Sequence, residues 1–280
     1  MRILTIGNFD GVHVGHQKLI ETAVKLAVRK KSKSCLMTFE GVPSVPRGCS
    51  LTTLDEKIEL LSGFGLNEIV VLNDEKSLWE MPPEKFIERI LLRLSPSDVV
   101  VGYNFRFGKN ASGTLRLMKK FLKKRKIEIR VIPAVRCEGE VVSSSDVRRS
   151  LVKGDVMDVR RKLDRFYGIS GTRRRGSGIA KKLGFPTINL EVDRNKLLPS
   201  GIFAGNAVAG DSIFKCIVYI GTSPTLKKDA KREIEFHVLD GKFDDKRSNW
   251  QVGLIRKIRD EVRFLSVSDL KKQIKKDIII

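Results

Sequence analysis

The chain has 280 residues, enough for two domains of ordinary size that each bury a core. Its 41% hydrophobic and 31% charged residues are the composition of a soluble globular protein. No apolar run is long enough to span a membrane and no signal peptide precedes the first predicted strand, so the sequence predicts a cytoplasmic protein with no membrane partner. The cysteines Cys35, Cys49, Cys137 and Cys216 lack metal-ligand spacing and are expected to be reduced thiols.

The formal net charge of +21 is large, and the excess is spread over both halves of the chain. Such an excess is found in proteins that bind nucleic acid and in proteins that attract polyanionic small molecules. The density of Lys, Arg and Glu is also typical of the surfaces of thermophilic proteins. Charge alone does not decide among these alternatives.

The first predicted element is a buried strand at residues 3–6, and helical periodicity extends from residue 19 to residue 27. Between them lies Gly-Asn-Phe-Asp-Gly-Val-His-Val-Gly-His-Gln, residues 7–17, which is a glycine-rich turn from strand to helix. In an open parallel sheet such a turn lies at the carboxyl edge, where ligands bind and helix amides hold phosphate.

Two histidines make this turn a candidate active site. His13 and His16 are three residues apart and therefore share a face of the helix's first turn. Imidazoles beside exposed helix amides suit the charge that develops on a transferring phosphate. Gly11 and Gly15 are expected to leave room for a nucleotide near the backbone. A cap or surface histidine is the alternative, and zinc is not favoured because no third ligand cluster is visible nearby.

Strands and helices alternate through the remainder of the first half. Strands are expected at residues 34–39, 68–72, 98–102 and 127–132, and helices at residues 54–61, 84–94 and 114–126. This alternation predicts a doubly wound α/β sheet of about five parallel strands in a domain over residues 1–162. The lysine-rich helix at 114–126 is interpreted as an amphipathic helix with a solvated face, and a nucleic-acid stripe is the alternative.

Two further loops fall at strand ends. Residues 102–113 combine glycines, aromatic rings and an arginine, and an aromatic face can stack on a flat ring. Residues 142–149 place serines at a helix start and Arg148 on the next turn, which makes a second phosphate cradle. An ordinary glycine-rich connection and a simple capped helix are the respective alternatives.

From about residue 163 the pattern changes to strands. Strands are expected at residues 202–209, 212–220 and 232–239, with a hairpin turn at 210–211 and a final helix at 267–278. These elements predict a compact β-barrel domain with a C-terminal helix over residues 163–280.

This second half carries its own candidate site. A basic, glycine-rich loop at residues 173–178 leads into Leu-Gly-Phe-Pro-Thr-Ile-Asn, residues 183–189. Thr187 and Asn189 alternate on one strand face and present oxygen ligands suited to Mg²⁺ that carries ATP phosphates. Glu235 lies on the polar face of a later strand, where the alternative to a functional role is a solvated glutamate.

The motif at residues 7–17 resembles the His-x-Gly-His motif of the nucleotidylyltransferase superfamily. In this extended form it resembles the bacterial bifunctional riboflavin kinase/FMN adenylyltransferases, also called FAD synthetases. Residues 102–113 and 142–149 are similar to that family's Gly-x-x-Phe-x-Phe-Gly and Ile-Ser-Ser-Thr-x-Ile-Arg loops. Residues 184–189 are similar to the Gly-Phe-Pro-Thr-x-Asn motif of its kinase module, and the resemblance covers nearly the whole chain.

The resemblance implies two active sites. In the first, His13, His16 and Arg148 are the implied catalytic residues. The implied nucleotide and flavin contacts there are Gly7, Phe9, Asp10, Gly11, Gly15, Asn104, Phe107, Gly108, Ser144 and Ser145. In the second, Glu235 is the implied base for the riboflavin 5′-hydroxyl, and Thr187 and Asn189 are the implied Mg²⁺ ligands. The implied nucleotide and flavin contacts of the second site are Gly176, Gly178, Gly184 and Pro186.

Three stretches depart from the family's pattern. Residues 38–46 differ from its Phe-x-Pro-x-Pro loop, Ala180-Lys181 replaces Gly-Arg, and residues 245–248 replace an Asp-Leu-Tyr-Gly turn. Flavin contacts at these places, and a fully active kinase module, do not follow from the resemblance.

The implied function is ATP-dependent phosphorylation of riboflavin to FMN, followed by adenylylation of FMN to FAD with release of pyrophosphate. The alternative is an adenylyltransferase of the same superfamily that acts only on FMN or another phosphate ester, with a weakened kinase module. A nucleic-acid-binding protein explains the charge but not the paired motifs. The expected ligands are Mg²⁺, ATP, riboflavin, FMN and FAD, and a monomer or weak oligomer is expected, without nucleic acid as a partner.

Overall fold

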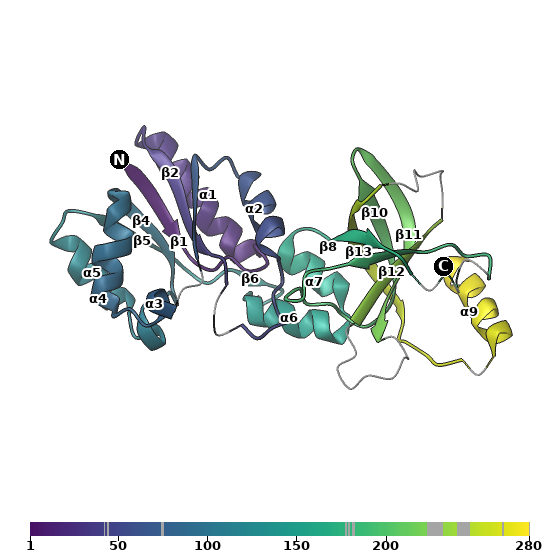
Figure 1. Cartoon of the computed structure of the whole chain (residues 1–280). Helices are drawn as coiled ribbons and strands as arrows, with labels where there is room; N and C mark the ends of the chain where they lie inside the picture. Colours follow the sequence, from purple (N-terminus) through teal and green to yellow (C-terminus); the bar gives the residue numbers. More distant parts are fainter. Residues whose placement is uncertain are drawn as a thin grey trace. The chain divides into compact units, whose positions relative to one another are not determined.

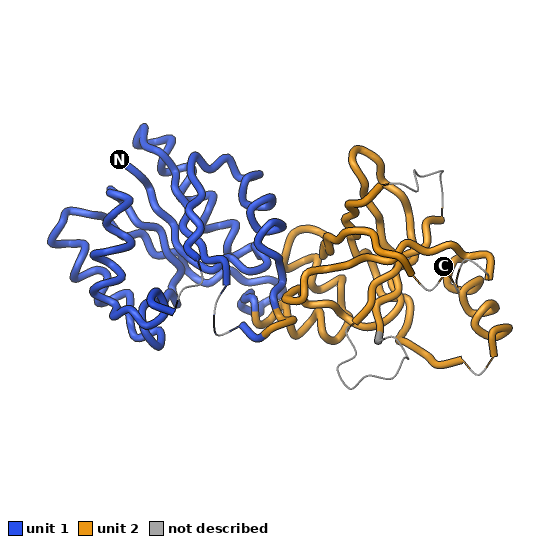
Figure 2. Tube along the Cα trace, in the orientation of Figure 1, with its two compact units in different colours: residues 1–46, 50–144 blue, residues 47–49, 145–280 orange. Residues whose placement is uncertain are grey.

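The computed structural model describes residues 1–41, 43, 45–73, 76–176, 178, 180, 183–222, 232–239, 247–264 and 266–279. Figure 1 shows the secondary structure of the chain. The chain divides into two compact units, residues 1–46 with 50–144 and residues 47–49 with 145–280, which Figure 2 colours separately.

The first unit is built on a sheet of five parallel strands in the order β3-β2-β1-β4-β5. The strands are β1 (Arg2–Ile6), β2 (Lys33–Phe39), β3 (Glu68–Leu72), β4 (Pro96–Gly102) and β5 (Glu128–Ile132). The predicted doubly wound α/β architecture is therefore confirmed. The order reverses beside β1, so the carboxyl ends of β1 and β4 flank the switch point where ligands bind in such sheets.

Helices cover both faces of this sheet (Figure 1). On one face lie α1 (Val14–Arg29) and α2 (Leu54–Ser62), and on the other lie α3 (Lys76–Trp79), α4 (Pro83–Phe86) and α5 (Leu115–Lys123). Two cores result from the alternation of side chains along the strands. Ile3 and Leu36 are buried in the core that includes α1, whereas Leu4 and Met37 are buried in the core that includes α4 and α5.

The helix expected over residues 84–94 is not one regular α-helix. It consists of α4, a π-helical turn η1 (Ile87–Leu91) and a 3₁₀ turn η2 (Leu92–Leu94). Ser95 follows in a left-handed conformation with φ of 47°, and β4 begins at Pro96. Because a proline disfavours the α conformation in the residue before it, the helix has to end here. Apolar periodicity does not distinguish these helix types.

The remaining short elements lie after β4 and between β5 and the barrel. They are the 3₁₀ turn η3 (Lys109–Ala111), the two-stranded hairpin β6 (Arg136–Cys137) and β7 (Glu140–Val141), and the helices α6 (Ser144–Lys153) and α7 (Val156–Leu163). Of these, the sequence predicted only the helix that begins at the serines of residues 143–145.

The second unit contains a closed barrel of six antiparallel strands in the order β10-β11-β12-β9-β8-β13. Its elements are β8 (Tyr167–Arg174), β9 (Ile188–Glu191), β10 (Gly201–Ala209), β11 (Ser212–Thr222), β12 (Arg232–Val238), β13 (Asn249–Arg259) and the helix α9 (Val267–Ile279). The predicted barrel with a C-terminal helix is confirmed. The structure adds β8 and β13, which pair with each other and close the barrel.

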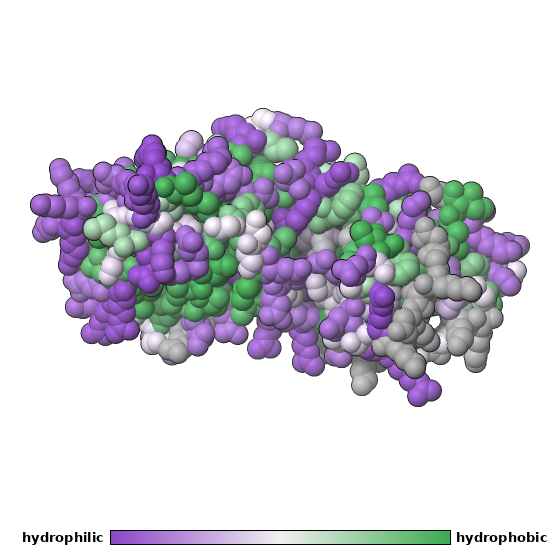
Figure 3. All heavy atoms as spheres, turned by 90° about the horizontal axis from the view of Figure 1, so that it is seen from above, coloured by the Kyte–Doolittle hydropathy of each residue, from purple (hydrophilic) through white to green (hydrophobic). Residues whose placement is uncertain are grey.

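Hydrophilic side chains cover most of the surface drawn in Figure 3, and apolar patches interrupt it on both units. Across the part of the chain that the structure describes, no helix combines the length and the apolar character needed to cross a membrane.

Candidate active sites

The turn between β1 and α1 has an unusual backbone. Gly11 has φ of 79°, but the non-glycine residues Phe9 (φ of 53°) and Val12 (φ of 40°) also lie at positive φ. Positive φ is costly for a β-branched residue such as Val12, and strain of this kind persists only where surrounding contacts enforce it. Such strain is frequent at functional sites, which agrees with the prediction of a site here.

Asp10 supplies contacts that enforce the turn. Its buried carboxylate accepts hydrogen bonds from the backbone N–H groups of Leu51 (2.9 Å) and Thr52 (3.1 Å). A Cβ on Gly11 would lie 2.7 Å from Cδ1 of Leu51, so a side chain there would collide with this packing. Room for a nucleotide, the expected reason for Gly11, is therefore not what the structure shows. Asp10 and Gly11 shape the turn and do not line the pocket beside it.

His13 and His16 stack on each other at the start of α1. Nδ1 of His13 accepts a hydrogen bond from the backbone N–H of His16 at 3.3 Å, and the ring centroids are 3.6 Å apart. A Cβ on Gly15 would lie 3.0 Å from Cε1 of His13, so this glycine permits the stacking. The two histidines therefore lie together, as their spacing predicts.

His16 has the electrostatic environment of a ligand contact. Burial, then the neighbouring His13, then the positive charge of Lys57 hold the pKa of His16 well below its usual range, so its ring is neutral at pH 7. Nδ1 of His16 is buried without a hydrogen-bond partner among the residues that the structure describes. Buried polar atoms are almost always paired, so this nitrogen is an exception that sets His16 apart from ordinary buried side chains.

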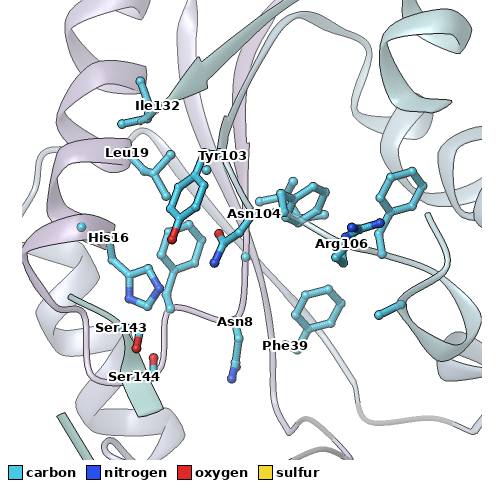
Figure 4. A pocket seen from close by; sticks show the side chains of 18 of the residues that line it. Asn8, His16, Leu19, Phe39, Tyr103, Asn104, Arg106, Ile132, Ser143 and Ser144 are labelled. Atoms are coloured by element: carbon cyan, nitrogen blue, oxygen red, sulfur yellow. The ribbon is translucent and has the colours of Figure 1, made fainter. Parts of the chain in front are cut away.

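A pocket of about 730 Å³ opens beside these histidines at the carboxyl edge of the sheet. This volume is within the usual range for small-molecule sites, about 300–1,000 Å³. Figure 4 shows His16 among the pocket residues, with Ser143 and Ser144 below it in this view and Tyr103 and Asn104 above and to its right. The predicted residues that line it are Gly7, Phe9, His13, Gly15, His16, Asn104, Phe107, Gly108 and Ser144.

Ser145 and Arg148 do not line this pocket. Nε of Arg148 donates a hydrogen bond to the carbonyl oxygen of Cys49 at 2.7 Å. An action of Arg148 on a phosphate therefore stays a prediction, and in this arrangement the guanidinium engages the backbone of the loop after β2.

Several pocket residues escaped the sequence analysis. Asn8 is part of the motif itself, and residues 133–135 directly follow β5. The rule that ligands bind at the carboxyl ends of parallel strands could have identified both places. Trp79 also lines the pocket, but it belongs to the four-residue helix α3 and no local pattern distinguishes it.

The second candidate site forms around Glu235 on β12. The barrel register pairs Glu235 with Asn189 on β9 and with Tyr219 on β11. Thr187, which directly precedes β9, donates a hydrogen bond from Oγ1 to Oε2 of Glu235 at 2.9 Å. Burial raises the pKa of Glu235, and the hydrogen bond from Thr187 opposes this effect. Thr187, Asn189 and Glu235, the three residues predicted for this site, therefore lie next to one another.

The glycine-rich loop before β9 supports this cluster. A Cβ on Gly176 would lie 2.2 Å from Nδ2 of Asn189, so only glycine accommodates the amide side chain. Gly178 (φ of 75°) and Gly184 (φ of 92°) are left-handed, with open space beside them. The carbonyl oxygen of Pro186 is hydrogen-bonded to Nδ1 of His237 at 2.8 Å, which fixes the segment that carries Thr187.

The oxygens of Thr187, Asn189 and Glu235 fit a magnesium ion by their chemistry, because Mg²⁺ prefers hard oxygen ligands and keeps several from phosphates and water. Among the residues that the structure describes, no group of three or more His, Cys, Asp or Glu side chains could hold a metal ion. A magnesium ion here would therefore depend on the phosphate oxygens of ATP.

The three stretches that depart from the family pattern are described only in part by the structure. Val42, Ser44, Lys181 and residues 245–246 lie outside the described residues. Arg247, at the end of the altered turn, donates a hydrogen bond to the carbonyl oxygen of Ala209 in β10.

Comparisons with known proteins cover both units. The family model of FAD synthetase matches residues 1–146, and the family model of riboflavin kinase matches residues 163–280. A bifunctional riboflavin kinase/FMN adenylyltransferase from Buchnera aphidicola subsp. Schizaphis graminum is 31% identical, over 99% of this chain and 92% of that protein. The protein of that name from Escherichia coli K12 is 30% identical, over 98% of this chain and 90% of that protein.

A crystal structure described as a macrolide-efflux protein from Streptococcus pneumoniae has a TM-score of 0.86 with 23% identity. The match covers 99% of this chain and 92% of that one, and at this identity it shows the fold alone. From the two family models and the full-length relatives together, the chain belongs to the family of bifunctional riboflavin kinase/FMN adenylyltransferases.

Proposed function

We propose that this chain converts riboflavin to FAD in two steps. The second unit transfers the terminal phosphoryl group of one ATP to riboflavin, which gives FMN and ADP. The first unit transfers AMP from a second ATP to FMN, which gives FAD and pyrophosphate. The observation that carries the proposal is that one chain contains both the His13–His16 pocket and the cluster around Glu235.

In the adenylylation step a phosphate oxygen of FMN attacks the α-phosphorus of ATP, and the bond to the pyrophosphate oxygen breaks. The neutral His16 ring and the positive end of the α1 dipole stabilise the negative charge that builds up on the phosphates. No acidic residue lies in the first turn of that helix, so the positive end of the helix dipole is not cancelled there. Asn104 and Ser144 contribute polar contacts from the pocket walls.

In the kinase step Glu235 accepts the proton of the riboflavin 5′-hydroxyl while that oxygen attacks the terminal phosphorus of ATP. The raised pKa of Glu235 brings its basicity nearer to neutral pH, where a general base works best. Thr187 and Asn189 are proposed to hold magnesium-bound ATP. When bound, Mg²⁺ supplies positive charge that neutralises the phosphates.

We also propose that the enzyme works in the cytoplasm as a monomer or weak oligomer, with small-molecule substrates and without nucleic acid. The paired motifs support small-molecule substrates, and the net charge of +21 agrees with them because a positive field attracts ATP and flavin phosphates. The alternative, an adenylyltransferase with a weakened kinase module, is not favoured because the riboflavin kinase model matches residues 163–280.

The direct test is a time course with riboflavin, ATP and Mg²⁺, in which the flavins are separated by chromatography. The proposal expects FMN to appear first and FAD to follow. A parallel reaction starts from FMN in place of riboflavin. If FAD forms from FMN but no product forms from riboflavin, the chain is an adenylyltransferase with a weakened kinase module. If neither product forms, the proposed function is wrong.

A further inference from the structure

A buried lysine lies beneath the first candidate site. Lys57 on α2 has only 4% of its surface exposed. Its Nζ donates hydrogen bonds to the carbonyl oxygen of Phe39 at 2.6 Å and to that of Asn8 at 3.2 Å. Phe39 ends β2 and Asn8 follows β1, and both residues line the pocket. Lys57 therefore joins two neighbouring strand ends that line the pocket.

The charge of Lys57 is costly to keep where it is. A buried ammonium normally requires a close carboxylate, whereas the oxygens that hold this one are neutral carbonyls. Burial lowers the pKa of Lys57 to about 8, and the charge of Asp10 opposes this effect. Lys57 in turn acts on His16, because its charge helps to lower the pKa of that histidine.

We propose that Lys57 is a positioning residue for adenylylation, which ties the ends of β1 and β2 together and places a fixed positive charge beneath the phosphate-binding part of the pocket. It acts through the backbone of Asn8 and Phe39 and through its field, without touching substrate. A charge fixed in a low-dielectric interior stabilises a developing anion without solvent reorganisation. The inference rests on the proposed function of the first unit.

Thr38 offers a matched control. Its Oγ1 donates a hydrogen bond to the same carbonyl oxygen of Asn8 at 3.0 Å, and its side chain is fully buried. Thr38→Val removes one uncharged donor to that oxygen at nearly constant volume. Lys57→Met removes the other donor together with the charge, and Lys57→Arg keeps the charge.

The experiment measures kcat and KM for FAD formation from FMN and ATP with the full-length chain, from about pH 6.5 to about pH 9.5. We expect Lys57→Met to lower kcat at least about tenfold, Thr38→Val to lower it less than about threefold, and Lys57→Arg to recover part of the loss. The wild-type kcat should fall as the pH rises through about 8, where Lys57 loses its proton, and Lys57→Met should lack this fall.

Phosphorylation of riboflavin by each variant occurs in the other unit, should not change, and serves to normalise the enzyme concentration, while thermal unfolding of each variant is the control for folding of the first unit. If Lys57→Met does not fold, Lys57→Gln takes its place with the same expected loss of kcat. An unchanged kcat, an equal loss in Thr38→Val, or an alkaline fall that persists without Lys57 would each overturn the inference. In those cases the wild type still makes FAD from FMN, so the proposed function stands without a role for Lys57. A wild type that makes no FAD from FMN would instead contradict the proposed function of the first unit, and the role of Lys57 with it.

Discussion

Glu235 shows how the barrel turns an ordinary side chain into a general base. The neighbouring strand residues Ile234 and Phe236 point into the barrel core, so Glu235 is left on the outer face. There the hydrogen bond from Thr187 orients the carboxylate, and burial raises its pKa. Orientation and raised basicity are the two properties that the proposed proton transfer requires.

The first prediction follows from this environment. Glu235→Gln should lower FMN formation by about 10²- to 10⁴-fold, because a positioned base contributes about that much, and should spare FAD formation from supplied FMN. Because the base must be ionised and its pKa is raised, wild-type FMN formation should fall as the pH drops through that pKa. This acid fall should therefore occur at a higher pH than for an exposed glutamate.

Measurement of kcat for FMN formation against pH, in the wild type and in Glu235→Gln, checks this prediction. If the residual kcat of the variant falls at low pH in the same way as that of the wild type, the pH dependence belongs to a group other than Glu235. Near-normal FMN formation by the variant would remove Glu235 from the mechanism altogether.

At the residue scale, the sequence predicts groupings that depend on local spacing and misses roles that depend on distant packing. His13 and His16 lie within one helical turn, so their proximity follows from their spacing. The role of Asp10 does not follow from local spacing, because its hydrogen-bond donors are the backbone N–H groups of Leu51 and Thr52, about forty residues later in the chain. The same packing explains Gly11.

The C-terminal helix α9 is attached to the barrel by a buried ion pair. Arg259, the last residue of β13, donates hydrogen bonds to both carboxylate oxygens of Asp277, with Nη2 to Oδ2 at 2.7 Å. Asp277 is 3% exposed and also accepts a hydrogen bond from Nε2 of Gln273 at 2.8 Å. Removal of one partner of a buried pair is costly because the other charge stays unpaired.

The second prediction concerns this attachment. Asp277→Ala should destabilise the contact of α9 with the barrel by about 3 kcal/mol, the lower end for a broken buried pair, because Arg259 is still partly exposed. Hydrogen exchange of α9 amides should become faster, while exchange in β11 and β12 stays slow. Lys275→Ala, an exposed change on the same helix, is the control, and equal exchange in both variants would contradict the prediction.

At the element scale, apolar periodicity predicted every strand of the parallel sheet but not the type of each helix. The segment from Pro83 to Leu94 changes from α to π to 3₁₀, and Pro96 accounts for its end but not for the change of helix type. Strands β8 and β13 were missed because strongly charged segments at their ends obscure the alternation. Their pairing joins residues that are far apart in the sequence, such as Tyr167 and Leu254, and is a product of barrel closure.

The division of the whole molecule into units does not follow the change of pattern near residue 163. The second unit contains residues 47–49 and 145–280 and so includes α7, whose Val156 and Val159 are buried. Arg160 on α7 lies 4.4 Å from the ring centroid of Phe166. Helices α6 and α7 continue the alternating pattern of the first half, so periodicity groups them with the sheet. The boundary at residues 162/163 stays a prediction.

The third prediction tests this organisation with two fragments. Residues 163–280 contain the implied kinase residues and are expected to phosphorylate riboflavin alone. Residues 145–280 should do so with greater stability, because they retain the burial of Val156 and Val159, and each such side chain contributes about 1.5–3 kcal/mol. Urea unfolding of both fragments measures the difference, and equal midpoints would mean that α7 contributes nothing to the stability of the barrel.

The central claim is that one chain carries two independent half-reactions, and a mixture of two variants tests it most directly. His16→Ala should make FMN from riboflavin but lose about 10²- to 10³-fold in FAD formation, whereas Glu235→Gln should make FAD only from supplied FMN. The measurement is the rate of FAD formation from riboflavin, ATP and Mg²⁺ by each variant alone and by the equimolar mixture. The account predicts little FAD from either variant alone and restored FAD formation in the mixture, because free FMN passes from one to the other. A mixture that makes no more FAD than the better single variant would contradict it.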